Sequence, residues 1–267
     1  MPRSDASRRY HNRVARRYDA IYSDPFWEFH DELTWRRIKP HLPRDLSIAC
    51  ADLGCGTGKW GMRLLKSGFA VTFVDSSPAM IEQSRRNVAE QKHNSTRARF
   101  EVADVVRMPQ LGADGFGLVL ALGDVLSICS DPQRACRELS RIVKPGGIAI
   151  ATADNKLAAL DHYVRLGNLD SLEEFVATGR TSWLTADERE QFELSTFTPG
   201  AFAKLFEKSG FEVLELTGKT VLPLRQNKSM LNADDAMQRL LKVEERLSRD
   251  PASVGRAAHL QIVAAKR

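Results

Sequence analysis

The chain has 267 residues, of which 43% are hydrophobic and 27% charged, and a formal net charge of +5. This composition excludes a disordered chain, a fibre and a small disulfide-stapled fold, and it allows one large α/β domain or two smaller ones. No apolar run approaches the roughly 20 residues of a membrane helix, and the Arg-rich start lacks the apolar segment of a signal peptide, so we expect no membrane span and a cytoplasmic protein.

Residues 5–40 are predicted to form two helices with a break at Ser23-Asp-Pro25. Six arginines and only one acidic residue, Asp5, lie in the first seventeen positions. Such a cluster can bind an anionic substrate or nucleic acid. A solvated helix face is the commoner explanation of such a cluster, so the arginines alone decide nothing about function.

Five short apolar runs between residues 48 and 152 alternate with amphipathic stretches. This alternation predicts βαβ units and a mostly parallel sheet. The runs cover residues 48–53, 70–75, 98–103, 116–122 and 147–152, and the helices 59–67, 78–91 and 132–143.

The pattern changes after residue 154, because residues 155–197 are mostly helical and polar and contain no strand-like run. A helix at 198–208, a strand at 212–221, a charged helix at 233–249 and a last strand at 259–266 follow. We interpret the chain as one domain with four parts. They are an N-terminal helical arm (1–44), a cofactor-binding core (45–154), a helical lid insertion (155–197) and C-terminal helices with a strand pair (198–267).

A glycine-rich turn, Asp52-Leu-Gly-Cys-Gly-Thr-Gly58, follows the first predicted strand and opens a helix. Glycines let backbone N–H groups approach a ligand closely, and the helix N-terminus favours negative charge. Gly56, Gly58 and Gly61 also satisfy the spacing G-x-G-x-x-G. A dinucleotide site, and with it a nicotinamide-dependent dehydrogenase, is therefore an alternative at this point.

Three acidic residues stand at the ends of successive predicted strands: Asp75, Asp104 and Asp124. Open α/β sheets bind ligands at the carboxyl ends of their strands, and a carboxylate there can accept hydrogen bonds from ribose hydroxyls. Each aspartate could separately be a helix cap. We expect all three at one rim, beside the glycine turn.

These motifs resemble those of the class I S-adenosylmethionine-dependent methyltransferases, and the likeness covers about residues 45–154. The matching stretches are Asp52-Leu-Gly-Cys-Gly-Thr-Gly58, Val74-Asp-Ser-Ser-Pro-Ala-Met80, Ala103-Asp104 and Leu139-Ser-Arg-Ile-Val-Lys-Pro-Gly-Gly147. The resemblance implies a Rossmann-like, doubly wound sheet of seven mostly parallel strands whose last strand is antiparallel. It also implies S-adenosylmethionine as cofactor and S-adenosylhomocysteine as its product.

The resemblance implies a set of cofactor contacts in this sequence. The methionine end would be held by Asp52, Gly54, Gly56 and Gly58, and Tyr18 would lie over the cofactor from the N-terminal arm. Tyr18 as a packing aromatic stays open as an alternative.

The adenosine end would be held by the residues after the second, third and fourth strands. Asp75, with Ser76 beside it, would bind the ribose hydroxyls, and Asp104 would accept from the adenine amino group. Met80 would pack on the adenine, although it also fits a core position. The backbone contacts would come from Val105 and Leu122.

The acceptor side is less clearly marked. Asp124 is the best-placed candidate for substrate contact or proton acceptance, and Tyr22, Tyr163 and His162 are further candidates in the flanking segments. The aromatic residues of positions 26–35 could wall an apolar pocket or face the core.

We expect no metal site, because the four cysteines contain no C-x-x-C pair and read as buried thiols. The function predicted is methyl transfer to an O, N, S or C atom of a small molecule by in-line displacement, in a monomer or homodimer without a nucleic-acid partner. The alternatives are methylation of RNA or protein, and a non-catalytic module that binds the cofactor.

Overall fold

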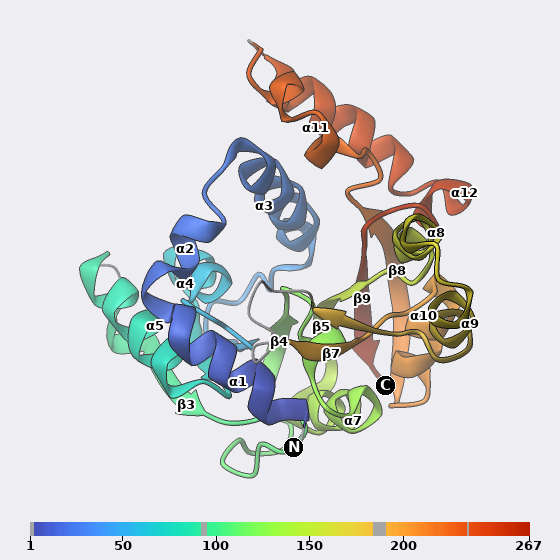
Figure 1. Cartoon of the computed structure of the whole chain (residues 1–267). Helices are drawn as coiled ribbons and strands as arrows, with labels where there is room; N and C mark the ends of the chain where they lie inside the picture. Colours follow the sequence, from blue (N-terminus) through green and yellow to red (C-terminus); the bar gives the residue numbers. More distant parts are fainter. Residues whose placement is uncertain (1–2, 92–94, 184–190, 234) are drawn as a thin grey trace.

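The computed structural model describes residues 3–91, 95–183, 191–233 and 235–267. Its centre is a seven-stranded sheet of order β3-β2-β1-β4-β5-β9-β8 (Figure 1). The strands are β1 (Ala49–Leu53), β2 (Ala70–Asp75), β3 (Ala98–Val102), β4 (Phe116–Ala121), β5 (Val143–Asp154), β8 (Phe211–Lys219) and β9 (His259–Lys266). Neighbours among β1 to β5 are parallel, and β9 is antiparallel to both β5 and β8. The predicted Rossmann-like sheet with an antiparallel last strand is confirmed.

Helices cover both faces of the sheet, because its central strands are apolar on both sides. In β4, Leu118 and Leu120 pack with the helices of one face, while Val119 and Ala121 pack with those of the other. The first face carries α3 (Pro25–Ile38), α4 (Lys59–Lys66) and α5 (Pro78–Glu90), and the second α7 (Pro132–Ile142) and α10 (Pro199–Glu207).

The N-terminal arm contains the break that its sequence predicts. It consists of α1 (Arg3–Val14), η1 (Ala15–Arg17), α2 (Tyr18–Ile21) and then α3. Asp24 caps α3 by accepting hydrogen bonds from two backbone N–H groups, and Pro25 occupies the first helical position. Figure 1 shows α1 crossing in front of the sheet toward β7.

The insertion after β5 is only partly as expected. It contains η4 (Leu157–Ala159), α8 (Leu160–Leu166) and α9 (Leu169–Thr178), but also the antiparallel pair β6 (Arg180–Trp183) and β7 (Phe192–Ser195). The prediction that 155–197 holds no strand is therefore wrong. Strands of four residues give too short an alternation to detect, and Phe192 and Leu194 become buried only where β7 packs against α1 and α6. Residues 184–190 of this expected lid lie outside the described part of the chain.

The C-terminal part closes the fold beside α3. Here α11 (Ala236–Leu247) packs on α3, and α12 (Pro251–Val254) packs on β8. The remaining short helices are η2 (Lys39–His41), η3 (Ser95–Arg97), α6 (Val125–Ile128), η6 (Leu224–Gln226) and η7 (Lys228–Leu231). Within the described ranges, every helix is too short or too polar to cross a bilayer.

Candidate functional site

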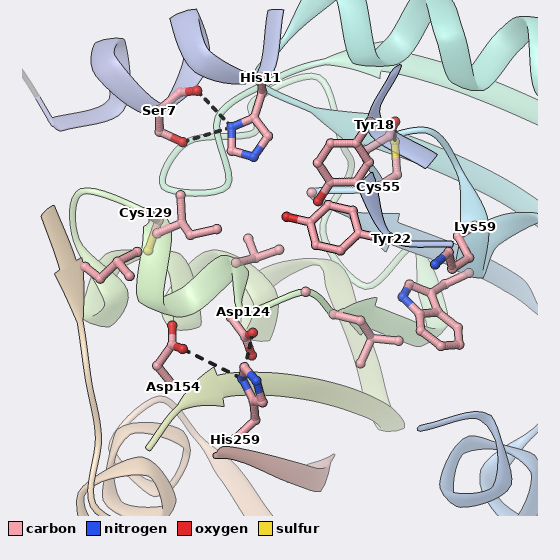
Figure 2. Close-up of a pocket in the computed structure, with 18 of the residues that line it drawn as sticks. Ser7, His11, Tyr18, Tyr22, Cys55, Lys59, Asp124, Cys129, Asp154 and His259 are labelled. Atoms are coloured by element: carbon pink, nitrogen blue, oxygen red, sulfur yellow. Dashed lines mark hydrogen bonds and ion pairs between the residues drawn. The ribbon is translucent and has the colours of Figure 1, made fainter. Parts of the chain in front are cut away.

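A cavity of about 470 Å³ opens at the carboxyl edge of the parallel strands. Its volume lies within the range usual for small-molecule sites. The wall is built by the N-terminal arm, the glycine turn after β1, the ends of β2 to β5, the insertion and the start of β9. Figure 2 shows Tyr18 and Tyr22 projecting from the arm on one side, with Asp124 and His259 on the other.

The glycine turn forms one end of this wall. Gly54 and Gly56 line the cavity with φ of +60° and +53°, values that few residues other than glycine adopt at low cost. A Cβ placed on Gly56 would meet only a ring carbon of Tyr18, at 3.9 Å, so the space before this turn is open.

Two residues of the same motif lie behind the turn and do not line the cavity, which corrects their expected contact with a cofactor. Asp52 is buried and its Oδ2 accepts a hydrogen bond from the backbone N–H of Gly61 at 2.7 Å. Burial raises the pKa of Asp52 to about 7. Gly58 packs against Ser84 and Phe73. Asp52 and Gly58 therefore shape the glycine turn from within the protein.

Asp75 joins the glycine turn to the end of β2. Its Oδ2 accepts from the N–H of Gly56 at 2.9 Å, and its Oδ1 accepts from the N–H of Ser77 at 2.8 Å. Because a carboxylate offers about four lone-pair positions, these bonds leave acceptor capacity for a ligand. Burial raises the pKa of Asp75, partly offset by these N–H groups.

The ends of β3 and β4 complete this part of the wall. Asp104 lines the cavity and turns the chain by accepting from the N–H of Val106 at 3.1 Å. The other predicted residues that line the cavity here are Ser76, Val105 and Leu122. The aspartates after β2, β3 and β4 thus share one cavity.

Met80 and His162 lie away from the cavity, contrary to their expected roles. Met80 is fully buried and packs with Tyr10, Val14 and Ala15, because α1 covers this side of α5. His162 lies on α8, where its ring packs edge-on against Tyr163, and neither residue lines the cavity.

Tyr18 and Tyr22 form an aromatic wall across the cavity. Their ring centroids are 4.8 Å apart, and Trp27 packs edge-on against Tyr22 at 4.8 Å. Burial raises the pKa of both tyrosines, so both hydroxyls are neutral near pH 7. Trp27 and His30 also line the cavity, whereas Phe26 and Phe29 face the core beside α11, so the predicted aromatic cluster serves both purposes.

A row of ionisable residues crosses the far end of the sheet, and the sequence did not reveal it. Asp154 at the end of β5 pairs in register with His259 at the start of β9, which pairs with Lys219 at the end of β8. All three line the cavity. The only signal in the sequence is that each ends or begins an apolar strand; their alignment depends on antiparallel registers between distant segments.

Asp124 and His259 form a close, mostly buried ion pair. Asp124 Oδ2 lies 3.0 Å from His259 Nδ1, with 16% and 18% of the side chains exposed, while Asp154 Oδ1 is 3.7 Å from the same nitrogen. Burial alone would raise the pKa of Asp124, but His259 outweighs it and holds this pKa below its usual range. Burial likewise works to lower the pKa of His259, yet Asp124 outweighs it and the net shift is upward.

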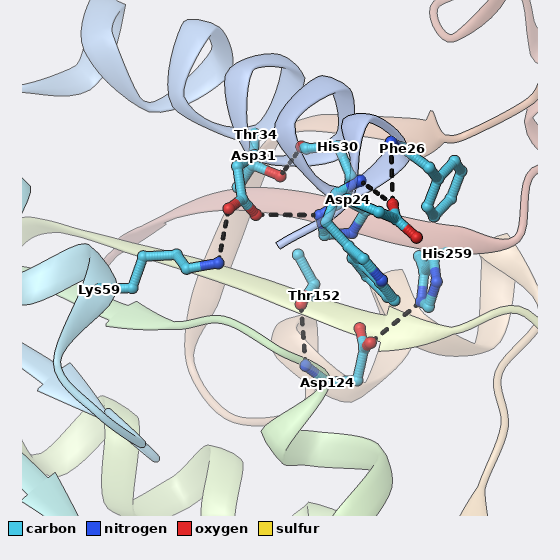
Figure 3. A network of polar contacts seen from close by, with 10 residues as sticks. Asp24, Phe26, His30, Asp31, Thr34, Lys59, Asp124, Thr152 and His259 are labelled. Atoms are coloured by element: carbon cyan, nitrogen blue, oxygen red, sulfur yellow. Dashed lines mark hydrogen bonds and ion pairs between the residues drawn. The ribbon is translucent and has the colours of Figure 1, made fainter. Parts of the chain in front are cut away.

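The backbone holds Asp124 in place for this contact. Asp124 has a φ of +62°, a strained value for a residue other than glycine, and its N–H donates to Thr152 Oγ1 at 3.0 Å (Figure 3). Asp154 is next to this pair, and burial together with the charge of Asp124 raises its pKa to about 6.

The ligand atoms of Asp124, Asp154 and His259 lie within 4.8 Å of one another, a spacing that also suits a metal ion. The positive charge of Lys219 acts on both carboxyls and would repel a divalent cation placed between them. The side chains of Asp124, Asp154 and His259 are therefore better suited to exchanging a proton than to binding a metal ion.

His30 and Asp31 of α3 border this end of the cavity. Asp31 Oδ2 accepts from Lys59 Nζ at 2.6 Å, and Asp31 Oδ1 lies 3.3 Å from His30 Nδ1 (Figure 3). Burial, with the charge of Lys219, lowers the pKa of His30 to about 3, so His30 is neutral at pH 7.

Comparison with known proteins places the core of the chain in a family. A family model described as a methyltransferase domain matches residues 50–147. The demethylmenaquinone methyltransferase of Leptospira interrogans is 31% identical over 145 residues, covering 51% of this chain and 55% of that protein. The ubiquinone biosynthesis O-methyltransferase of Caulobacter vibrioides is 29% identical and is covered to 66%. The matches thus span less than two thirds of these relatives' own lengths.

Solved structures share the fold across most of the chain. A methyltransferase from Methanosarcina mazei superposes with a TM-score of 0.62 and 18% identity, covering 86% of this chain and 96% of that one. Another, from Mesorhizobium loti, gives 0.58 and 18% identity, with 88% and 98% covered. These structures show that the fold is shared, and the family model identifies residues 50–147 as a methyltransferase domain.

Proposed function

We propose that the protein transfers a methyl group from S-adenosylmethionine to a small-molecule acceptor by in-line displacement. The observation that carries this proposal is one continuous cavity. It joins the glycine turn and the carboxyls of Asp75 and Asp104 at one end to the row of Asp124, Asp154 and His259 at the other. Two relatives are named for steps in quinone synthesis, which supports a small acceptor rather than a macromolecule.

The cofactor fits the first of these ends. The open space before Gly56 admits a ligand to the backbone of the turn, and the remaining acceptor capacity of the Asp75 carboxylate suits the hydroxyls of a ribose. Asp104 would accept from the adenine amino group. The other residues that we propose for cofactor contact are Tyr18, Gly54, Ser76, Val105 and Leu122.

The acceptor would occupy the space between Tyr22 and the Asp124–His259 pair. A sulfonium is already an activated methyl donor, so the protein needs mainly to align the acceptor atom and exclude water. Alignment alone can lower a barrier by about 7–11 kcal/mol. The arm and the insertion, which meet where Tyr10 packs on Phe192 at 6.0 Å, would act as the cover.

Where the acceptor atom carries a proton, we propose His259 as the group that accepts it. The carboxylate of Asp124 is a weak base, because its pKa is lowered, whereas its charge stabilises a protonated His259. Nδ1 of His259 faces Asp124. In the neutral ring, which is populated above the raised pKa of His259, the charge of Asp124 would favour the proton on Nδ1 and leave Nε2 to accept a proton. We therefore propose that Asp124 orients His259 and stabilises its protonated form, and that Tyr22 contacts the substrate.

The first test is calorimetric titration of the wild type with S-adenosylhomocysteine and, separately, with NAD. We expect binding of S-adenosylhomocysteine only. Binding of NAD instead would favour a dehydrogenase, and binding of neither would reject the cofactor site.

The second test is methyl transfer from radiolabelled S-adenosylmethionine to a panel of phenols, thiols, amines and carboxylic acids. Asp124→Asn and His259→Gln should lower turnover by about 10²–10⁴-fold on acceptors that lose a proton, with little change in S-adenosylhomocysteine affinity. Intact binding with no turnover on the whole panel would favour a non-catalytic binding module. We also propose a monomer or homodimer in the cytoplasm, which light scattering and cell fractionation would test.

A further inference from the structure

Lys219 is a buried cation with no partner of its own. It ends β8, only 1% of it is exposed, and it lines the cavity. Among the described residues, its side chain makes no hydrogen bond and no ion pair within 4 Å. Burial lowers the pKa of Lys219, and the charges of Asp124 and Asp31 oppose this from a distance.

The carboxylates nearest to Lys219 already have other partners. Asp31 is bound to Lys59 at 2.6 Å, and Asp124 to His259 at 3.0 Å. An ammonium taken out of water without a partner costs several kcal/mol. The burial of an unpaired ammonium group in a cavity wall is explained if a ligand supplies the missing negative charge.

Arg225 is a second cation on the same cavity. Its guanidinium carbon lies 4.9 Å from the ring centroid of Trp27 and 5.4 Å from that of Phe26, and these contacts hold it at the cavity wall. No ion pair joins Arg225 to an acidic residue in the described chain. Its donors therefore remain available to a ligand.

The cofactor is badly placed to supply this negative charge. In the sheet order, β8 is separated from β1 by β4, β5 and β9. Four strand spacings of about 4.8 Å put the end of β8 roughly 19 Å from the glycine turn. Lys219 consequently belongs to the part of the cavity assigned to the acceptor, a cavity that Tyr22 and Trp27 also line.

We propose that the acceptor is an amphipathic acid: an apolar or aromatic body that lies against Tyr22 and Trp27 and carries a carboxylate bound by Lys219, with Arg225 assisting at the cavity wall. This deepens the proposed function and rests on it. A carboxylate bound there would also fix the acceptor's orientation relative to the Asp124–His259 pair.

The test compares matched acids and amides on the protein saturated with S-adenosylhomocysteine. The probes are indole-3-acetate with indole-3-acetamide, and 4-hydroxybenzoate with 4-hydroxybenzamide, titrated by calorimetry and ligand-observed NMR at pH 7. We expect the wild type to bind at least one acid 10-fold or more tighter than its amide. Lys219→Met should abolish this preference, and Arg225→Gln should reduce it.

Lys266→Met is the matched control, because Lys266 pairs with Asp114 and does not line the cavity. It should keep the preference for the acid. Binding of S-adenosylhomocysteine to each variant reports that the variant is folded, and Arg225→Gln keeps the test available should Lys219→Met fail to fold.

The outcomes separate the two proposals. Loss of S-adenosylhomocysteine binding in the wild type rejects the proposed function itself. If S-adenosylhomocysteine binds normally, three results would reject only the present inference. They are equal binding of the amides and the acids, no binding of any acid, and an acid preference that survives in Lys219→Met.

Discussion

Replacing Asp124 by asparagine tests the ion pair on which the proton-accepting site depends. Asparagine tolerates the left-handed backbone that Asp124 adopts at φ +62°, so the substitution removes the charge and leaves the turn intact. A hydrogen bond to a charged group contributes about 1.5–3 kcal/mol, and breaking a buried ion pair costs about 3–5 kcal/mol. Because 16% and 18% of the two side chains remain exposed, we expect a loss near 2–3 kcal/mol at pH 6.

The sign of the pH dependence follows from the two pKa shifts. The pKa of His259 is raised, so its contribution to stability is complete below its unfolded value and disappears as the pH rises through the folded value. The pKa of Asp124 is lowered, so its contribution is present above its unfolded value and disappears as the pH falls through the folded one. The pair therefore stabilises the fold from about pH 4 up to the raised pKa of His259.

The assay is thermal unfolding at pH 6 and pH 9. For a chain of this size, 1 kcal/mol shifts Tm by about 2–4 °C, so Asp124→Asn should lower Tm by roughly 4–12 °C at pH 6. Once the pH exceeds the raised pKa of His259, the ring is neutral and asparagine can still accept its Nδ1 proton, so the loss should fall toward about 1 kcal/mol.

Asp114→Asn is the control, because Asp114 has a φ of +53° and pairs with Lys266 while 53% exposed. An exposed pair contributes about 0.2–1 kcal/mol, so its loss should be small and the same at both pH values. An equal loss at pH 6 and pH 9 in Asp124→Asn would refute the charge argument for His259.

Three further predictions concern the turn and the residues around it. Asp75→Ala should weaken binding of S-adenosylhomocysteine by about 1.5–3 kcal/mol, measured by calorimetry; unchanged affinity would contradict the ribose assignment. Gly61→Ala should cost about 1–3 kcal/mol in urea unfolding, since its Cβ would lie 2.2 Å from a ring carbon of Phe73, whereas Gly112→Ala has open space and should be nearly neutral. His162→Ala should leave S-adenosylhomocysteine affinity and turnover within twofold, because His162 lies away from the cavity, and a tenfold loss of turnover would restore it as a candidate.

Local pattern was enough to predict the parallel core. Short apolar runs, a proline at the start of α5, and a glycine turn each specify structure through their immediate neighbours in the chain. The parallel βαβ arrangement then brings the ends of β2, β3 and β4 to one edge, which is why Asp75, Asp104 and Asp124 could be predicted to share a rim.

Pattern failed where a residue's environment depends on distant segments. The resemblance implies a cofactor contact for Met80, but α1 covers it and it takes the core position that the sequence left open. Phe192 and Leu194 are buried against α1 and α6. Neither packing can be read from the residues themselves.

The sequence by itself determined the fold class and the end of the cavity that suits the cofactor, because those features are written in contiguous motifs. Only the tertiary structure decided the acceptor end. There, Asp154, His259 and Lys219 meet through two antiparallel registers, and burial beside one another, rather than residue type, sets their charges.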